Sequence, residues 1–285
     1  FDIVRVDTTW EAKQAPVFGG DPASAKRSRP GRDASSAKAL HLPVIGRPPV
    51  ADPIAPTALS AAAQHRTLWV VAPNLDDALA TAATHPGIDT LELELASYAG
   101  LAAALDASGR LGAYALARAV AKTAAQAQEL VALAGSFQVA VVLSRATSEW
   151  LCALDPVPSG LVVVQPTYER LTECRDHDVA WEDFFTRFGE RAPVEGLPKC
   201  IAPASRPRPR VLDTSMMTAH GQLEIFRFTQ RFVRDHYFIK SLRCAGCVHE
   251  PSCQGLHVNQ VRAHGFATMK PVGESERRNA LPAAV

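Results

Sequence analysis

The chain has few cysteines and no long hydrophobic run. The first argues against a disulfide-rich secreted protein, and the second argues against a membrane-spanning one. Six of its 285 residues are cysteine, which is too sparse for the disulfide framework of a small secreted protein. No apolar run reaches the ~18 residues of a membrane span. The opening residues 1–6 lack the basic start and the apolar stretch of a signal peptide. We therefore expect a cytoplasmic protein with no membrane partner.

An excess of charge of either sign is also missing. The sequence has 30 Lys and Arg against 29 Asp and Glu, with a net charge of +1, so nothing indicates a nucleic acid partner. No Ser-His-Asp arrangement, phosphate loop or dinucleotide fingerprint is present. Hydrophobic residues make up 47% of the chain, which is enough for one large domain with a small appendix.

Predicted strands alternate with predicted helices, which favours an α/β fold. A strand within residues 1–9 opens the chain. Further strands are expected over 67–72, 88–95, 111–116, 137–143 and 161–165, and helices over 74–84, 98–108, 120–134 and 180–188. This order implies a parallel sheet with right-handed crossovers. The strand count fits an open or partial barrel better than a closed one.

Two proline-rich stretches divide the chain. Residues 16–56 have no hydrophobic period and are expected to form a long loop. Residues 202–209 contain three prolines and mark a boundary. We expect a partial barrel over 1–202, a small domain over 203–273 with helices over 223–237 and 257–264, and a loose tail over 274–285.

Three cysteines cluster in the predicted small domain. Cys244, Cys247 and Cys253 have C-x2-C-x5-C spacing, which lets thiolates converge on one zinc ion or one iron–sulfur cluster. For zinc, His249 or His257 is the candidate fourth ligand. The spacing alone permits both kinds of site.

The segment Val4-Arg5-Val6-Asp7-Thr8-Thr9-Trp10, the cysteine cluster and Val261-Arg262-Ala263-His264-Gly265 resemble the radical SAM superfamily. More narrowly, they resemble members with a C-terminal auxiliary 4Fe-4S domain of the SPASM or twitch type. The resemblance implies a partial parallel (β/α) barrel of radical SAM type followed by a small cysteine-rich cluster domain. It also implies one auxiliary 4Fe-4S cluster, bound by Cys244, Cys247 and Cys253 with Cys200 as the fourth ligand.

The chain departs from this family at the motif that binds the SAM-cleaving cluster. Ala12, Pro16 and Gly19 stand where the family has the cysteines of CxxxCxxC, and none of them offers a side-chain ligand to iron. The stretch Leu91–Ser97 also lacks the glycine-rich end that approaches S-adenosylmethionine. The resemblance therefore implies a pseudoenzyme without SAM cleavage. Such a protein would pair with an active radical SAM paralogue or present a peptide substrate.

Two alternatives stay open. The first is an active radical SAM enzyme whose cysteine motif is missing from this chain, which opens on Phe1 rather than Met. The second is a zinc-stabilised α/β binding module. The sequence leaves open whether the protein is an enzyme.

Other chemically active residues receive structural interpretations. Cys174 precedes Asp176, His177 and Asp178, but no second spacing supports a metal site, so a solvated loop is expected. Glu92 and Glu94 share one strand face. Exposure to solvent is expected for it, with a polar barrel interior that meets a ligand as the alternative. The aromatic residues of the small domain are expected to pack around the cluster: Phe226, Phe228, Phe232, Tyr237 and Phe238.

Overall fold

A single curled sheet of parallel strands organises the first two thirds of the molecule. The computed structural model describes residues 3–9, 67–208, 211–217 and 222–273. The predicted 16–56 loop, the positions Ala12, Pro16 and Gly19, and the tail 274–285 lie outside the described residues. The described strands are β1 (Ile3–Asp7), β2 (Thr67–Ala72), β3 (Thr90–Leu95), β4 (Arg110–Leu111), β5 (Tyr114–Ala121), β6 (Gln138–Val142), β7 (Leu161–Val164), β8 (Val194–Glu195) and β9 (Val211–Asp213).

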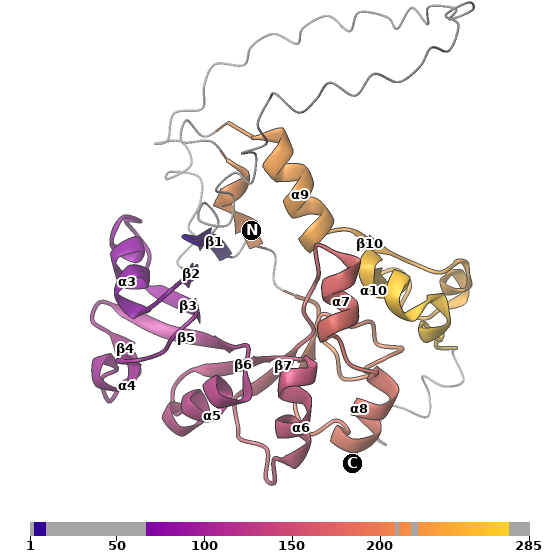
Figure 1. Cartoon of the computed structure of the whole chain (residues 1–285), viewed down its shortest axis with the longest axis horizontal. Helices are drawn as coiled ribbons and strands as arrows, with labels where there is room; N and C mark the ends of the chain where they lie inside the picture. Colours follow the sequence, from indigo (N-terminus) through magenta and orange to yellow (C-terminus); the bar gives the residue numbers. More distant parts are fainter. Residues whose placement is uncertain (1–2, 10–66, 209–210, 218–221, 274–285) are drawn as a thin grey trace, which may run out of the picture.

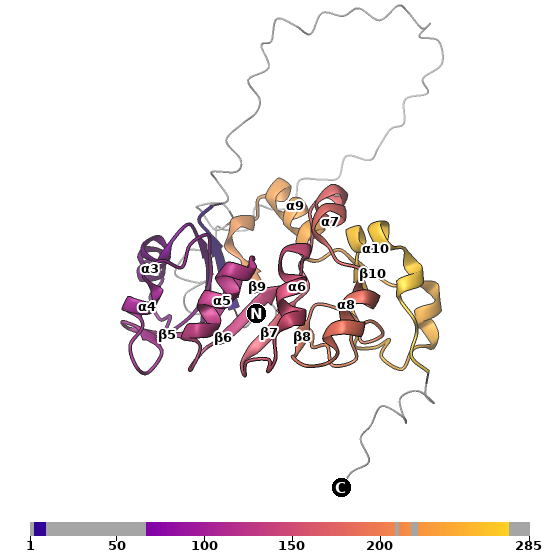
Figure 2. The ribbon, with the colours of Figure 1, turned by 60° about the horizontal axis from the view of Figure 1, so that its bottom comes forward.

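The strand order is that of a half-barrel. The nine-stranded sheet of the described residues runs β8-β7-β6-β5-β3-β2-β1-β9, with β4 beside β5. Every pair along this order is parallel, whereas β4 and β5 form an antiparallel pair. The sheet curls without closing (Figures 1 and 2). These features confirm the prediction of an α/β fold with a partial barrel.

Helices cover the outer face of this sheet and bury its apolar side chains. Strand β3 alternates leucines, which are buried in the core, with Glu92 and Glu94 on the opposite face. The leucines share that core with residues of the covering helices, such as Ala78 and Leu130. The helices of this region are α3 (Leu75–Ala83), α4 (Leu101–Ala104), α5 (Ala124–Leu133), α6 (Arg145–Ala153), α7 (Leu171–His177) and α8 (Trp181–Phe188).

The remaining described residues form short elements that contact the half-barrel both at β1 and at α7. They include α9 (Ile225–Asp235) and α10 (Val258–His264), which correspond to the helices predicted over 223–237 and 257–264 and not to the strand that is the alternative over 223–237. Strand β9 pairs with β1, so the chain returns to the sheet after the proline-rich stretch. The elements after β9 are η2 (Thr214–Met216), α9 (Ile225–Asp235), β10 (Phe238–Ile239), η3 (Leu242–Gly246), β11 (Leu256–His257), α10 (Val258–His264) and η4 (Phe266–Thr268).

Several predicted bounds near residues 98–121 are wrong, and the predicted strand over 111–116 divides into β4 and the start of β5. The predicted helix over 98–108 is reduced to α4: the Tyr98 hydroxyl is hydrogen-bonded to the backbone of Leu93 and Val120 before the helix, and Leu105 is already extended after it. Gly100, which precedes α4, is in the left-handed conformation. Val120 belongs to β5 rather than to the following helix, which begins only after the Thr123 N-cap.

Candidate functional site

The structure brings the four predicted cluster cysteines to one pocket. Cys200 follows β8, Cys244 lies on η3, and Cys247 and Cys253 follow η3. All four line a single pocket, together with Pro198, Lys199, Lys240, His249, Glu250, Gly255, Met269 and Pro271. We call this the four-cysteine pocket. Four thiolates around one pocket match the ligand requirement of a 4Fe-4S cluster.

Short backbone turns hold the C-terminal cysteines of this pocket. The Cys247 amide donates to the carbonyl of Cys244 at 3.0 Å, and the Cys253 amide donates to the carbonyl of His249 at 2.9 Å. Two further amides point at sulfur: that of Gly255 lies 3.2 Å from Cys253 Sγ, and that of Val272 lies 3.4 Å from Cys247 Sγ. Such N–H···S contacts stabilise anionic sulfur and tune the potential of a bound cluster.

Burial opposes ionisation of the Cys200 thiol. Burial raises the pKa of Cys200, a hydrogen bond with the backbone of Lys270 lowers it, and the neighbouring Cys253, Cys244 and Cys247 raise it. A bound iron or zinc cation would oppose this rise, because it stabilises the thiolate.

The two histidines proposed as zinc ligands lie in different places. His249 lines the four-cysteine pocket. His257 is fully buried and its Nε2 lies 2.8 Å from the carbonyl oxygen of Val233. His249 is therefore the histidine that the structure leaves as an alternative ligand at this pocket.

The predicted packing of the aromatic residues around the cluster is wrong for most of them. Phe226 is 71% exposed, and Phe228, Phe232 and Tyr237 are also exposed. The reason is that α9 turns its buried face toward the sheet with Arg231, which is fully buried, and leaves its aromatic face to solvent.

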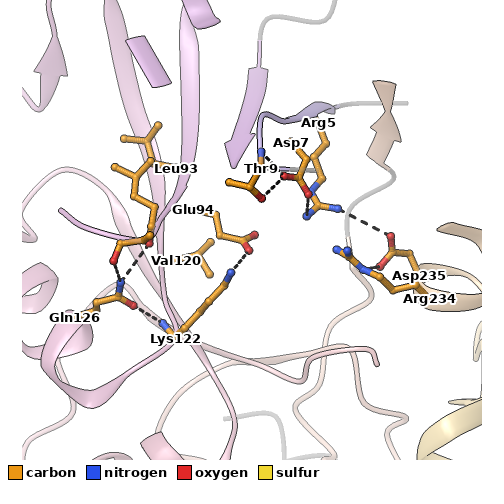
Figure 3. Close-up of polar contacts among 12 residues, drawn as sticks. Arg5, Asp7, Thr9, Leu93, Glu94, Val120, Lys122, Gln126, Arg234 and Asp235 are labelled. Atoms are coloured by element: carbon orange, nitrogen blue, oxygen red, sulfur yellow. Dashed lines mark hydrogen bonds and ion pairs between the residues drawn. The ribbon is translucent and has the colours of Figure 1, made fainter. Parts of the chain in front are cut away.

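Charged side chains gather at the carboxyl edge of the half-barrel. The carboxyl-edge cluster consists of Arg5, Asp7, Asp213, Arg231 and Asp235. Arg5 Nη1 lies 3.1 Å from Asp213 Oδ2 and 4.0 Å from Asp235 Oδ2, and Figure 3 shows Arg5 facing Asp235. Arg231 Nη2 lies 3.1 Å from Asp7 Oδ2. Burial would raise the pKa of Asp7, but its hydrogen bond from Thr9 and the charges of Arg5 and Arg231 hold that pKa below its usual value.

The predicted exposure of Glu92 and Glu94 is also wrong. The Glu94 side chain is only 11% exposed, and its Oε1 lies 2.6 Å from Lys122 Nζ (Figure 3). Burial raises the pKa of Glu92, although Arg118 opposes this. Both carboxylates point to the inner face of the half-barrel, where neighbouring strands shield them. The inner face is therefore polar and charged.

Some buried donors on this inner face have no acceptor. Arg5 Nε, Trp69 Nε1, and Arg208 Nε and Nη2 are buried and have no hydrogen-bond partner among the described residues. An unsatisfied buried donor carries a desolvation cost of about 1–3 kcal/mol, so an acceptor brought by a ligand would stabilise this face. The sequence offered a polar barrel interior as the alternative for Glu92 and Glu94, and the charged Arg5 between Val4 and Val6 was a further signal for this face.

Cys174 and Asp178 do not lie in the predicted solvated loop. Cys174 lies on α7 and Asp178 caps that helix, and both side chains are buried. The structure adds His264, from α10, to this pair. His264 is distant in sequence, which is why no local spacing could indicate the group.

Comparisons with known proteins returned nothing: no protein-family model, curated protein or solved structure matches the chain. In the described part of the chain, no helix combines the length and the apolar character needed to cross a membrane.

Proposed function

We propose that the chain is a radical SAM-like protein that holds one auxiliary 4Fe-4S cluster and has lost SAM cleavage. In this role it acts as a non-catalytic partner in the modification of a peptide or small molecule. The observation that carries the proposal is the meeting of Cys200 with Cys244, Cys247 and Cys253 in one pocket. Cys200 lies far from the other three cysteines in sequence, and only the family resemblance indicated that it would join them.

The four-cysteine pocket offers four sulfur ligands, which both a 4Fe-4S cluster and a structural zinc ion can use. The resemblance to radical SAM proteins with an auxiliary cluster is what favours the cluster over zinc in this proposal.

Two surfaces support a partner role. The inner face of the half-barrel carries buried donors that a ligand with acceptor oxygens would satisfy. Helix α9 exposes Ile225 and Phe226, at 67% and 71% exposure, and adjacent exposed apolar side chains of this kind are typical of protein contacts. Both features fit a protein that binds a substrate or another chain without carrying out the chemistry itself.

Anaerobic purification followed by iron, sulfide and zinc analysis tests the cluster. We expect about four irons and four sulfides per chain, with the broad absorption of thiolate-bound iron. Cys200→Ala should lower the iron content, because it removes one ligand. Cys152→Ala is the matched control, since Cys152 lies outside the four-cysteine pocket and its loss should leave iron unchanged.

Two other results would replace the proposal. One zinc per chain at the four-cysteine pocket, without sulfide, would favour the zinc-stabilised binding module. More than four irons with binding and cleavage of S-adenosylmethionine would favour the active enzyme. For the partner role, failure of the purified protein to form a complex with a radical SAM protein encoded beside it, at micromolar concentration, would count against it.

A further inference from the structure

Cys174, Asp178 and His264 form a second potential metal-binding group, which we call the Cys–Asp–His trio. Cys174 comes from α7, Asp178 directly follows α7, and His264 is the last residue of α10. Their Sγ, carboxylate oxygen and ring nitrogen all lie within 4.8 Å of one another. Specifically, His264 Nε2 lies 2.9 Å and Cys174 Sγ lies 3.7 Å from Asp178 Oδ2.

We propose that the Cys–Asp–His trio binds one divalent cation, best matched by Zn²⁺, and so fastens α10 onto α7. Zinc takes sulfur, nitrogen and oxygen ligands at about 2.0–2.3 Å. In a tetrahedral site this places the ligand atoms about 3.3–3.8 Å apart. The printed separations of 2.9 Å and 3.7 Å lie close to that range and the third is at most 4.8 Å, so small side-chain shifts suffice to accommodate the ion.

The charge of the trio suits a divalent cation. A thiolate, a carboxylate and a neutral imidazole carry two negative charges, which cancel those of Zn²⁺. A mixed sulfur, nitrogen and oxygen set also favours zinc over the hard cations Mg²⁺ and Ca²⁺, which prefer oxygen alone. On binding, the Cys174 thiol releases its proton to solvent as the S–Zn bond forms, and the His264 proton moves to Nδ1 so that Nε2 can bind the ion.

Surrounding residues hold the ligands by atoms that the ion would not use. Asp178 Oδ1 accepts hydrogen bonds from Gln165 Nε2 at 2.9 Å and from the Val179 amide at 3.1 Å, while Oδ2 faces the other two ligands. Trp181 donates to Gln165 Oε1 at 2.9 Å, and its ring packs against His264 with centroids 4.4 Å apart. This second layer fixes the carboxylate and the imidazole as the outer partners of metal ligands do.

A further buried group is left without a partner beside the trio. The Tyr168 side chain is 93% buried, since only 7% of its surface is exposed, and its hydroxyl has no hydrogen-bond partner among the described residues. Burial is the largest cause that raises the pKa of the Tyr168 hydroxyl, and the electrostatic effects of Asp178 and Cys174 follow. Three protein ligands leave one position of a tetrahedral ion open, and a water there would give this hydroxyl a partner.

The ion would have a structural consequence. Helices α7 and α10 pack against each other, and the trio spans this contact. The His264 side chain is 22% exposed, whereas that of Asp178 is 1% exposed, so an ion would enter from the histidine side. The Cys174 thiol is buried, and its Sγ faces Asp178 Oδ2 at 3.7 Å.

Zinc retention by the purified full chain tests the proposal. The protein is incubated anaerobically with Zn²⁺, freed of excess metal by gel filtration, and analysed for zinc and iron. We expect the wild-type chain to retain about one more zinc than His264→Gln or Cys174→Ser, with iron unchanged. With Co²⁺ as the probe, the thiolate-to-cobalt absorption should appear in the wild type and disappear in Cys174→Ser.

The variants separate metal loss from misfolding. Glutamine at position 264 can still donate to Asp178, so this variant should fold. His177→Gln is the matched control, because His177 is exposed and is not part of the trio. Zinc should raise the thermal midpoint of the wild type and of His177→Gln but not that of His264→Gln. Equal zinc retention by all variants would overturn the proposal and leave the trio as a hydrogen-bonded contact.

This inference does not depend on the content of the four-cysteine pocket. If that pocket holds zinc, the wild type retains two zinc ions and His264→Gln retains one. If it holds a 4Fe-4S cluster, the corresponding zinc counts are one and none, and iron is unaffected. The difference between wild type and variant therefore reports on the trio alone.

Discussion

At the scale of single residues, Arg231 stands out because its fully buried guanidinium joins two parts of the chain that are far apart in sequence. It lies 3.1 Å from Asp7 Oδ2 and 3.4 Å from Asp213 Oδ2, and those side chains are 3% and 5% exposed. Buried ions are costly to desolvate, so such a pair contributes little compared with a well-packed apolar pair. Its importance appears when one partner is removed and the others stay buried.

Arg231→Ala should therefore be strongly destabilising. Removal of the cation leaves Asp7 and Asp213 buried with less compensating charge, and breaking a buried pair in this way costs about 3–5 kcal/mol. The free energy of unfolding, measured by urea titration of the anaerobic protein, provides the check. Arg227→Ala is the control on the same helix, because the ion pair of Arg227 with Glu224 is partly exposed and 3.9 Å long. Its loss should cost less than about 1 kcal/mol, and equal costs would contradict the argument.

Single residues also show where sequence reasoning succeeds and fails. The meeting of the four cysteines at one pocket was predictable, because three share a local spacing and the family resemblance pointed to Cys200. The trio was not predictable, since His264 reaches Asp178 only through the packing of α10 on α7. The burial of Arg231 was not predictable either. The aromatic residues of α9 indicated that their own face would be buried, whereas the structure buries the face that carries Arg231.

At the scale of elements, the short β10–β11 pair shapes the four-cysteine pocket. Gly255 directly precedes β11 and has a φ of +88°. A Cβ at this position would lie 2.2 Å from the carbonyl oxygen of Ile239 on β10. Gly255 therefore permits a close approach between two backbone segments. The backbone that approaches is that of the neighbouring strand.

Gly255→Ala should lower both stability and iron content. The added Cβ meets a backbone carbonyl that cannot move without separating β10 from β11, and the Gly255 amide also donates to Cys253 Sγ. Gly265→Ala is the matched control: Gly265 has a φ of +81°, but a Cβ there meets nothing within 4 Å. We expect Gly265→Ala to cost about 1 kcal/mol from backbone strain and to keep its iron. Equal iron content in the two variants would refute the role given to Gly255.

Element boundaries were predictable where a cap marks them and unpredictable where tertiary contacts decide. The Asn74 side chain accepts a hydrogen bond from the Asp77 amide at 2.9 Å and begins α3 as predicted. The start of α5 was predicted too early, because residues 120–121 pair with β6 instead. Helices α6 and α7 were not predicted. Helix α6 has a capping box at Ser144 and Thr147, which was a readable signal.

At the scale of the whole molecule, buried histidine couples stability to pH. His257 is the last residue of β11 and the N-cap of α10, and it contacts the carbonyl of Val233 on α9, so it links three elements of the C-terminal region. Burial lowers the pKa of His257 below 6.5, although its hydrogen bond with Val233 opposes this shift. The native state therefore binds a proton at this residue less readily than the unfolded chain does.

The sign of the resulting pH dependence follows from linkage. Below pH 6.5 the unfolded chain takes up a proton at His257 before the native state does, so the free energy of unfolding falls as pH decreases through this window. We expect the urea midpoint of the anaerobic holoprotein to fall between pH 7.5 and pH 5.5, and to fall less in His257→Gln, which has no group to protonate there. Between pH 8.5 and pH 7.5 both proteins should show the same slope, because histidine is neutral in both states. Identical slopes of unfolding free energy against pH for the two proteins below pH 6.5 would mean that His257 does not carry this effect. The carboxylates at the sheet edge would not explain a fall in this window, because the pKa of Asp7 is held below its usual 3.8 and its contribution is lost only at lower pH.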